Sequence, residues 1–246
     1  MVEKTGLSNI PNSHLPSASL VGQFEDTHKK ESMAGYMEDN LDMPLGMLLP
    51  IMQDSIINRT TYFGVRTWKG PIDAWLYQEI IFETKPDVIV EIGNAYGGSA
   101  LLLAHLCDLI GNGRVIGLDL SHQTVPEHVK AHPRITFLEG DACHNFEQVE
   151  RLIAKDETVL VIEDSSHTFD NTLGVLRLYS KLIKVGHYFI VEDGVCHHGL
   201  EIGPDPGPYE AVEAFIRESG DFEIDRSRER FLLTWNPQGY LRRTKA

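Results

Sequence analysis

Hydrophobic and polar positions follow one repeating order from residue 73 onward. Short apolar runs, typical of strands buried on both faces, alternate with longer stretches whose apolar residues recur at helical spacing. The runs lie at residues 88–92, 115–119, 135–138, 159–163 and 188–192, and the helical stretches at 73–83, 99–110, 145–154 and 168–184. This alternation with short connections predicts an α/β fold, in which helices cover both faces of a mostly parallel sheet.

The C-terminal part departs from this order. A helix is predicted from Pro208 to about residue 219. Two apolar runs follow, at 222–225 and 231–235, with a charged connection between them. We expect these runs to form an antiparallel strand pair at the edge of the sheet.

The N-terminal part is different in composition. Residues 1–45 are polar with little periodicity, which is typical of an arm outside the core. Residues 43–57 are apolar but interrupted by two prolines and a glycine, so a short helix there could pack on the core, line a site or contact another subunit. We therefore divide the chain into an N-terminal arm with a short helical segment (1–60) and one domain (61–246).

A glycine-containing loop follows the first predicted strand, in the sequence VIVEIGNAYGGS at residues 88–99. Gly93, Gly97 and Gly98 lack a Cβ, so a ligand can lie against bare backbone at a helix N-terminus. A dinucleotide fingerprint needs glycine at its first, third and sixth positions, and the third is Ala95 here. The loop favours a nucleotide-type ligand; a purely structural turn is the alternative.

Acidic residues follow the next two strands. Ligands of open α/β sheets bind beyond the carboxyl ends of the strands. Asp119 ends the second strand, where a carboxylate can accept hydrogen bonds from both hydroxyls of a ribose or can cap a helix. Asp141 follows the third strand and could contact the amine of an adenine or cap the next helix.

Several carboxylates meet at the ends of the fourth and fifth strands. Asp164, Glu192 and Asp193 would repel one another unless a cation neutralised them, and a hard divalent cation prefers oxygen ligands. These three are the candidate metal ligands; helix capping or pairing with Lys or Arg is the alternative. Glu163 could point away from the site because strand residues alternate.

His167 lies three residues after Asp164. An imidazole titrates near neutral pH, so His167 is a suitable general base beside a metal-bound hydroxyl. A packing or surface role is the alternative.

The composition narrows the class of partner. The 246 residues carry a formal net charge of -14, which argues against a nucleic-acid backbone and suits a cation. Three separate cysteines without a C-x-x-C pair indicate reduced thiols. No apolar run approaches the ~18 residues of a membrane span, and residues 1–20 lack a signal-peptide pattern. We expect a cytoplasmic protein without a membrane partner.

Three stretches of the chain resemble one known family. They are GVRTWKGPIDAWLYQEIIFETKPDVIVEIGNAYGGSALLLA, VLVIEDSSHTFDNTLGVLRLYSKLIKVGHYFIVED, and GPDPGPYEAVEAF with RFLLTWNPQGYLRR. Residues 62–243 are similar to the S-adenosylmethionine (SAM)-dependent methyltransferase-like family of cephalosporin hydroxylases. This family includes proteins of cephamycin methoxylation and rhamnosyl O-methyltransferases. The resemblance implies a class I methyltransferase fold, a Rossmann-like three-layer sandwich, with SAM as the methyl donor.

The resemblance also implies a Mg²⁺-type site at Asp164, Glu192 and Asp193. A more distant likeness to catechol-type O-methyltransferases places Lys69 near the cofactor and His167 where those enzymes carry a catalytic lysine. The expected cofactor contacts are Lys69, Glu91, Gly93, Tyr96, Gly97, Ser99, Asp119, Asp141 and Asp164.

We therefore expect a metal-dependent O-methyltransferase that moves the SAM methyl group to a hydroxyl of a small natural-product-type substrate, with His167 as the base. One alternative is a non-catalytic partner protein with a SAM fold in a two-component modification system. Another is an NAD-dependent oxidoreductase, which Ala95 and the lack of a Tyr-x-x-x-Lys pair disfavour. The apolar N-terminal segment and the C-terminal strands are compatible with a homo-oligomer.

Overall fold

The computed structural model describes residues 36–246. These residues fall into two parts, residues 36–40 with the 3-10 helix η1 (Met37–Asp39) and the compact unit Leu41–Ala246. Most of the predicted arm, residues 1–35, lies outside the described residues. The predicted division between residues 60 and 61 stays a prediction.

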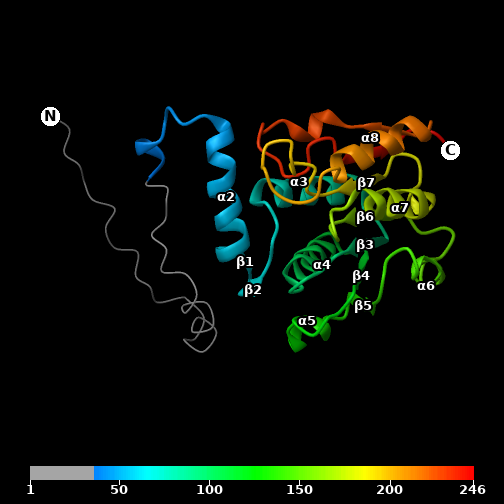
Figure 1. Ribbon diagram of the computed structural model, residues 1–246. Coiled ribbons are helices and arrows are strands. Elements are labelled where there is room, and N and C mark those ends of the chain that lie inside the picture. The colour runs from blue at the N-terminus through cyan, green and yellow to red at the C-terminus, as the bar shows by residue number, and fades with distance from the viewer. Residues whose placement is uncertain (1–35) are drawn as a thin grey trace. The chain divides into compact units, whose positions relative to one another are not determined.

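The compact unit contains a seven-stranded sheet in the order β5-β4-β3-β6-β7-β9-β8 (Figure 1). The strands are β3 (Val88–Ile92), β4 (Arg114–Asp119), β5 (Ile135–Glu139), β6 (Val159–Glu163), β7 (Tyr188–Val191), β8 (Phe222–Ile224) and β9 (Tyr240–Arg243). The first five strands of that order run parallel, and β9 is antiparallel to both β7 and β8. A separate hairpin pairs β1 (Thr61–Tyr62) with β2 (Val65–Arg66). The mostly parallel sheet with an antiparallel edge is confirmed.

Helices cover both faces of this sheet. They are α3 (Pro71–Thr84), α4 (Gly98–Ile110), α5 (Glu127–Lys130), α6 (Phe146–Arg151), α7 (Phe169–Tyr179) and α8 (Pro208–Glu218), with the 3-10 helices η2 (Ser180–Leu182) and η3 (Arg226–Glu229). Because neighbouring strand residues point to opposite faces, Val88 and Val90 of β3 pack in a core with α7 and α8, and Ile89 packs in a second core with α3 and α4. Figure 1 shows α4 and α7 on opposite sides of the strands. The expected three-layer architecture is confirmed.

The antiparallel partner of β8 differs from our expectation. The predicted strand at 231–235 is wrong, because β8 pairs with β9 instead. Phe231 and Leu232 are 46% and 83% exposed, and Leu232 has a left-handed φ of 64°. This segment therefore has no buried strand face, whereas Tyr240 and Leu241 of β9 are fully buried.

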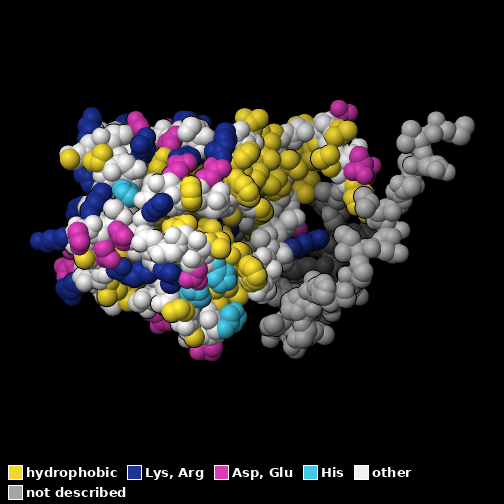
Figure 2. Space-filling model, turned by 180° about the vertical axis from the view of Figure 1, so that it is seen from behind, with side chains coloured by type: hydrophobic (Ala, Val, Ile, Leu, Met, Phe, Trp, Pro, Cys, Tyr) yellow, Lys and Arg dark blue, Asp and Glu magenta, His cyan; other side chains and the backbone are white. Residues whose placement is uncertain are grey.

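Helix α2 (Leu45–Arg59) covers most of the apolar segment at 43–57. Leu49 and Ile56 pack in a third core with residues that follow β7 and precede β9. Leu45 and Met47 of the same helix are exposed, and Figure 2 shows hydrophobic side chains gathered over this part of the surface. At 15 residues α2 is the longest described helix, and none of the described helices combines the length and apolarity needed to cross a membrane.

Candidate active site

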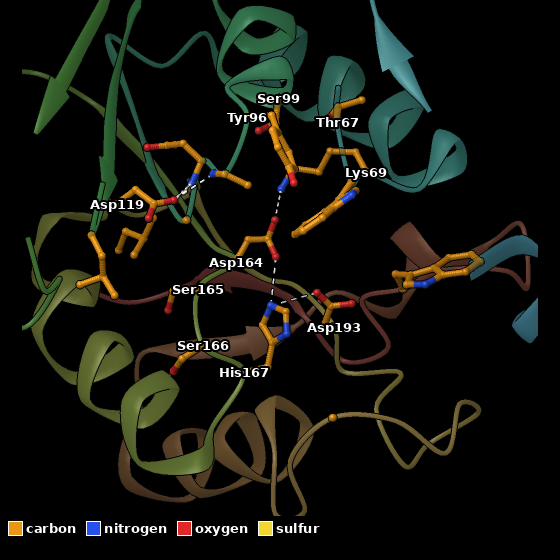
Figure 3. A pocket seen from close by; sticks show the side chains of 18 of the residues that line it. Thr67, Lys69, Tyr96, Ser99, Asp119, Asp164, Ser165, Ser166, His167 and Asp193 are labelled. Atoms are coloured by element: carbon orange, nitrogen blue, oxygen red, sulfur yellow. Dashed lines mark hydrogen bonds and ion pairs between the residues drawn. The ribbon is translucent and has the colours of Figure 1, made fainter. Parts of the chain in front are cut away.

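A cavity of about 570 Å³ lies where the parallel strands end. The segments that follow β3, β4, β5, β6 and β7 all contribute to it, together with α2 and the residues around Lys69 and Trp235. In Figure 3, Asp119 and Asp193 lie on opposite sides, with Asp164 and His167 between them.

Gly93 holds the loop after β3 against the end of β6. Its φ of +88° is one that L side chains rarely adopt, and a Cβ here would lie 1.9 Å from the carbonyl oxygen of Asp164. The close approach of two backbone segments therefore requires glycine.

Asp119, at the end of β4, fixes the same loop. Its Oδ2 accepts hydrogen bonds from the backbone N–H groups of Asn94 and Ala95, at 2.8 and 2.9 Å. Asp119 also lines the cavity, and within residues 36–246 its Oδ1 has no hydrogen-bond partner. That oxygen can accept hydrogen bonds from ligand hydroxyls.

Asp141 lies at the cavity and stabilises the turn before α6, and its contact with an adenine stays a prediction. Its Oδ1 accepts a hydrogen bond from the backbone N–H of His144 at 2.9 Å, which stabilises the turn before α6. The residue also lines the cavity, in the segment after β5.

Lys69 is the counter-ion of a buried acidic group. Its Nζ lies 2.6 Å from Asp164 Oδ2 and 3.7 Å from Glu91 Oε1, and it forms an ion pair with Glu192. Burial raises the pKa of the Glu91 and Glu192 carboxyls. Burial alone would lower the pKa of Lys69, but the three carboxylates outweigh it and raise the pKa well above the ordinary value. Lys69 therefore stays protonated.

His167 joins the other side of this group. Its Nε2 lies 3.2 Å from Asp164 Oδ1 and 3.1 Å from Asp193 Oδ2 (Figure 3). Burial lowers the pKa of His167, but the two carboxylates outweigh it and bring the pKa to about 9. Burial raises the pKa of Asp193 to about 6. The ligand atoms of these three residues lie within 4.8 Å of one another, a spacing at which they could hold one metal ion.

Glu163, the last residue of β6, makes its side-chain hydrogen bonds to Ser165 and Asn171 and not to this group. It is 2% exposed, and its Oε1 accepts a hydrogen bond from Ser165 Oγ at 2.6 Å. Burial raises the pKa of Glu163 to about 7. Its role is to anchor the segment that carries Asp164.

The comparisons with known proteins agree on one family. The family model for rhamnosyl O-methyltransferase/CmcI matches residues 54–244. The chain belongs to this family. Rhamnosyl O-methyltransferases from Mycobacterium tuberculosis and Mycobacterium leprae are each 36% identical to it, over 192 and 194 residues. The alignments cover 74% and 75% of this chain and 78% and 83% of those proteins.

Solved structures show the same relationship. The Mg–SAM form of CmcI aligns with a TM-score of 0.59 and 25% identity, over 75% of this chain and 76% of that one. An O-methyltransferase from Bacillus cereus in complex with SAH (S-adenosylhomocysteine), 18% identical, shares the fold with a TM-score of 0.50 over 76% of this chain and 86% of that one. The expected family, its Rossmann-like fold and its enzyme class, the SAM-dependent O-methyltransferases, are confirmed.

The cavity brings most of the residues implied by this family together. Those that line it are Lys69, Gly93, Tyr96, Ser99, Asp119, Asp141, Asp164, His167 and Asp193. Glu91, Gly97 and Glu192 do not line it. Glu91 and Glu192 face Lys69 instead, and Gly97 caps the N-terminus of α4 with a φ of +80°.

Other residues of the cavity carried no motif in the sequence. The Arg66 guanidinium lies over the rings of Tyr96 and Trp68 and donates a hydrogen bond to the Tyr96 hydroxyl at 3.0 Å. Gln53 and Trp235 also line the cavity, although 182 residues separate them. In the sequence, only the position of Arg66 and Trp68 beside Lys69, in RTWK, could have indicated that they belong to the site. The hydrogen bond between Trp235 and Gln53 depends on the tertiary fold and has no local sequence pattern.

Proposed function

We propose that this protein transfers the methyl group of SAM to a hydroxyl oxygen of a small natural-product-type substrate, with a divalent cation in the site. One observation carries the proposal. A single cavity joins the glycine loop and Asp119 to the group of Asp164, His167 and Asp193.

The residues on the Asp119 side fit SAM. Asp119 would accept hydrogen bonds from the ribose hydroxyls, Asp141 would contact the adenine side, and the loop from Gly93 to Ser99 would present bare backbone and a hydroxyl. The carboxylate of Asp164 suits the positive sulfonium. The complexes of CmcI with SAM and SAH support this assignment.

Three residues would support the cofactor site indirectly, Glu91 and Gly97 from behind the cavity wall and Lys69 from within it. Glu91 accepts a hydrogen bond from Asn94 Nδ2 at 2.7 Å and so supports the glycine loop. Gly97 allows α4 to begin next to Val125, whose Cγ1 would lie 2.8 Å from a Cβ at this position. Lys69 holds Asp164 in place through its ion pair.

The residues on the Asp193 side fit a divalent cation. The carboxylate oxygens of Asp164 and Asp193 converge there beside the His167 ring, and carboxylate oxygens are ligands that suit Mg²⁺ or Mn²⁺. Asp164 and Asp193 are the ligands in this proposal, whereas Glu192, the third ligand expected from the sequence, pairs with Lys69. The Mg–SAM form of CmcI supports such a site. A bound cation would polarise the acceptor hydroxyl and supply positive charge in place of the His167 proton.

His167 is the proposed general base. It lines the cavity, and Asp164 and Asp193 orient its ring through Nε2. With its positive charge taken over by the cation, the neutral imidazole of His167 would receive the hydroxyl proton as the oxygen attacks the methyl carbon and the carbon–sulfur bond of SAM breaks. Orientation of the two reactants by the cavity walls would supply much of the remaining acceleration.

The acceptor is a small molecule in this proposal. A cavity of about 570 Å³ is within the range of small-molecule sites. The mycobacterial relatives are rhamnosyl O-methyltransferases, so sugar hydroxyls are the first acceptors to test.

Calorimetry and mass spectrometry test the proposal together. SAH should bind one-to-one in Mg²⁺ buffer, and sugars or catechols should gain one methyl group from SAM. Asp193→Asn should abolish turnover and retain SAH binding, whereas the exposed Asp170→Asn on α7 should change neither. Failure of the folded protein to bind SAH would refute the cofactor assignment, and full turnover by Asp193→Asn would refute the cation site.

A further inference from the structure

One wall of the cavity consists of residues to which the proposed function assigns neither the cofactor nor the cation. Gln53 and Ile56 of α2, Cys196 and Ile202 of the segment after β7, and Trp235 line it. Ile56 and Trp235 also belong to the same apolar core. The wall therefore joins three segments that are far apart in the sequence.

Trp235 is held firmly in this wall. Its backbone N–H donates a hydrogen bond to Asp73 Oδ2 at 2.9 Å, and the hydroxyl of Tyr240 donates to Asp73 Oδ1 at 2.8 Å. The carbonyl of Trp235 accepts a hydrogen bond from the backbone N–H of Val195 at 3.1 Å. Because Val195 follows Asp193 by two residues, the wall is tied to the acidic group.

Gln53 adds one polar donor to the wall. The indole Nε1–H of Trp235 donates to Gln53 Oε1, which fixes the orientation of the amide. Its Nε2 has no hydrogen-bond partner within the part of the chain that the structure describes. An aromatic face beside an amide donor suits a hydroxylated ring, whose apolar face packs on the indole while a ring oxygen or hydroxyl accepts a hydrogen bond.

We propose that Gln53 and Trp235 form the acceptor subsite and select a hydroxylated ring with a flat apolar face, such as the sugar of a glycoside. This inference rests on the proposed function. The family match begins at residue 54, so Trp235 lies within the matched residues and Gln53 directly before them.

The experiment measures acceptor binding to the complex of the full-length protein with SAH and Mg²⁺. The probes are 4-nitrophenyl α-L-rhamnopyranoside, which offers a ring, and propane-1,2-diol, which offers neighbouring hydroxyls without one. Gln53→Leu removes the amide and keeps the size of the side chain. Gln148→Leu, on the exposed side of α6, is the matched control. Trp235→Phe keeps an aromatic ring and removes the indole N–H.

We expect the wild-type complex to bind the rhamnoside and not the diol. Gln53→Leu should weaken rhamnoside binding about 3- to 10-fold, the loss of one neutral hydrogen bond, and Trp235→Phe should weaken it as well. Gln148→Leu should leave it unchanged, and all variants should retain the wild-type Kd for SAH.

Three results would overturn the inference and leave the proposed function intact. The first is normal SAH binding with no binding of the rhamnoside by the wild type. The second is rhamnoside binding that Gln53→Leu does not change. The third is an equal loss of SAH and rhamnoside binding in Gln53→Leu, which would make Gln53 a cofactor contact. Absence of SAH binding by the wild type would instead refute the proposed function, and this inference with it.

Discussion

Replacing Gly93 by alanine tests how tightly the glycine loop after β3 is fixed to Asp164, the residue that follows β6. A Cβ at residue 93 would lie 1.9 Å from the carbonyl oxygen of Asp164 and 2.6 Å from its carbonyl carbon. Gly186 has the same φ of +88°, but a Cβ there has nothing within 4 Å. Gly186→Ala therefore introduces only left-handed strain, about 1–2 kcal/mol. Gly93→Ala adds a displacement of backbone, for which overpacking costs of about 1–3 kcal/mol are typical.

We expect Gly93→Ala to lower the free energy of unfolding by about 2–5 kcal/mol, and Gly186→Ala by the strain alone. Urea denaturation of both variants measures the difference. Because the same loop donates two backbone hydrogen bonds to Asp119, Gly93→Ala should also weaken SAH binding, and Gly186→Ala should not. Equal loss of stability in the two variants would show that the loop moves freely past Asp164, and the argument for a fixed loop would be refuted.

Three further predictions concern charged residues of the site. His167→Ala should lower kcat by roughly 10²–10⁴-fold with an unchanged Kd for SAH; a nearly normal kcat would remove His167 from the mechanism. Lys69→Met should cost about 3–5 kcal/mol of stability at neutral pH, because it leaves buried carboxylates without their cation. Burial raises the pKa of Glu91 and Glu192, so the folded variant keeps protons at a pH at which the unfolded chain has lost them. The loss of unfolding free energy relative to the wild type should therefore shrink as the pH falls toward the ordinary glutamate pKa. Urea denaturation of the variant and the wild type across this pH range measures the difference, and a difference that does not change with pH would contradict the prediction. Asp119→Ala should weaken SAH binding by at least about 10-fold in calorimetry, and an unchanged Kd would exclude Asp119 as a ribose contact.

The sequence predicted the centre of the fold better than its edge. Strands β3 and β6 have the predicted bounds, because burial on both faces produces a continuous apolar run. The run at 231–235 also contains apolar and β-branched residues, but it serves another purpose. Thr234 Oγ1 and the backbone of Trp235 donate hydrogen bonds to Asp73. Hydrogen bonds between segments that are far apart in the sequence produce no local periodicity, so the sequence pattern could not predict them.

The site shows the same division between local and long-range information. The sequence placed Asp119, Asp164 and Asp193 at strand ends, where the parallel sheet brings them to one edge. It left pairing of these acids with Lys or Arg as an alternative, but the residues did not show which one would lie between Asp164 and Glu192. The meeting of Lys69 with these strand ends depends on the path of the chain before α3, which local patterns do not determine.

The consecutive acids at the end of β7 divide the acidic group into two halves. Glu192 faces Lys69, and Asp193 faces His167. Asp193 and His167 both have a left-handed φ of 56°, a conformation that non-glycine residues keep only where surrounding structure imposes it. Asp164 belongs to both halves, because its Oδ2 contacts Lys69 and its Oδ1 contacts His167. Lys69 and His167 thus supply two positive charges to the four carboxylates of Glu91, Asp164, Glu192 and Asp193. The Lys69 half is buried, while the half that lines the cavity holds the His167 proton, which a metal ion could replace. This division explains how the acids can be stable in the folded protein and still leave a negative site open to a ligand.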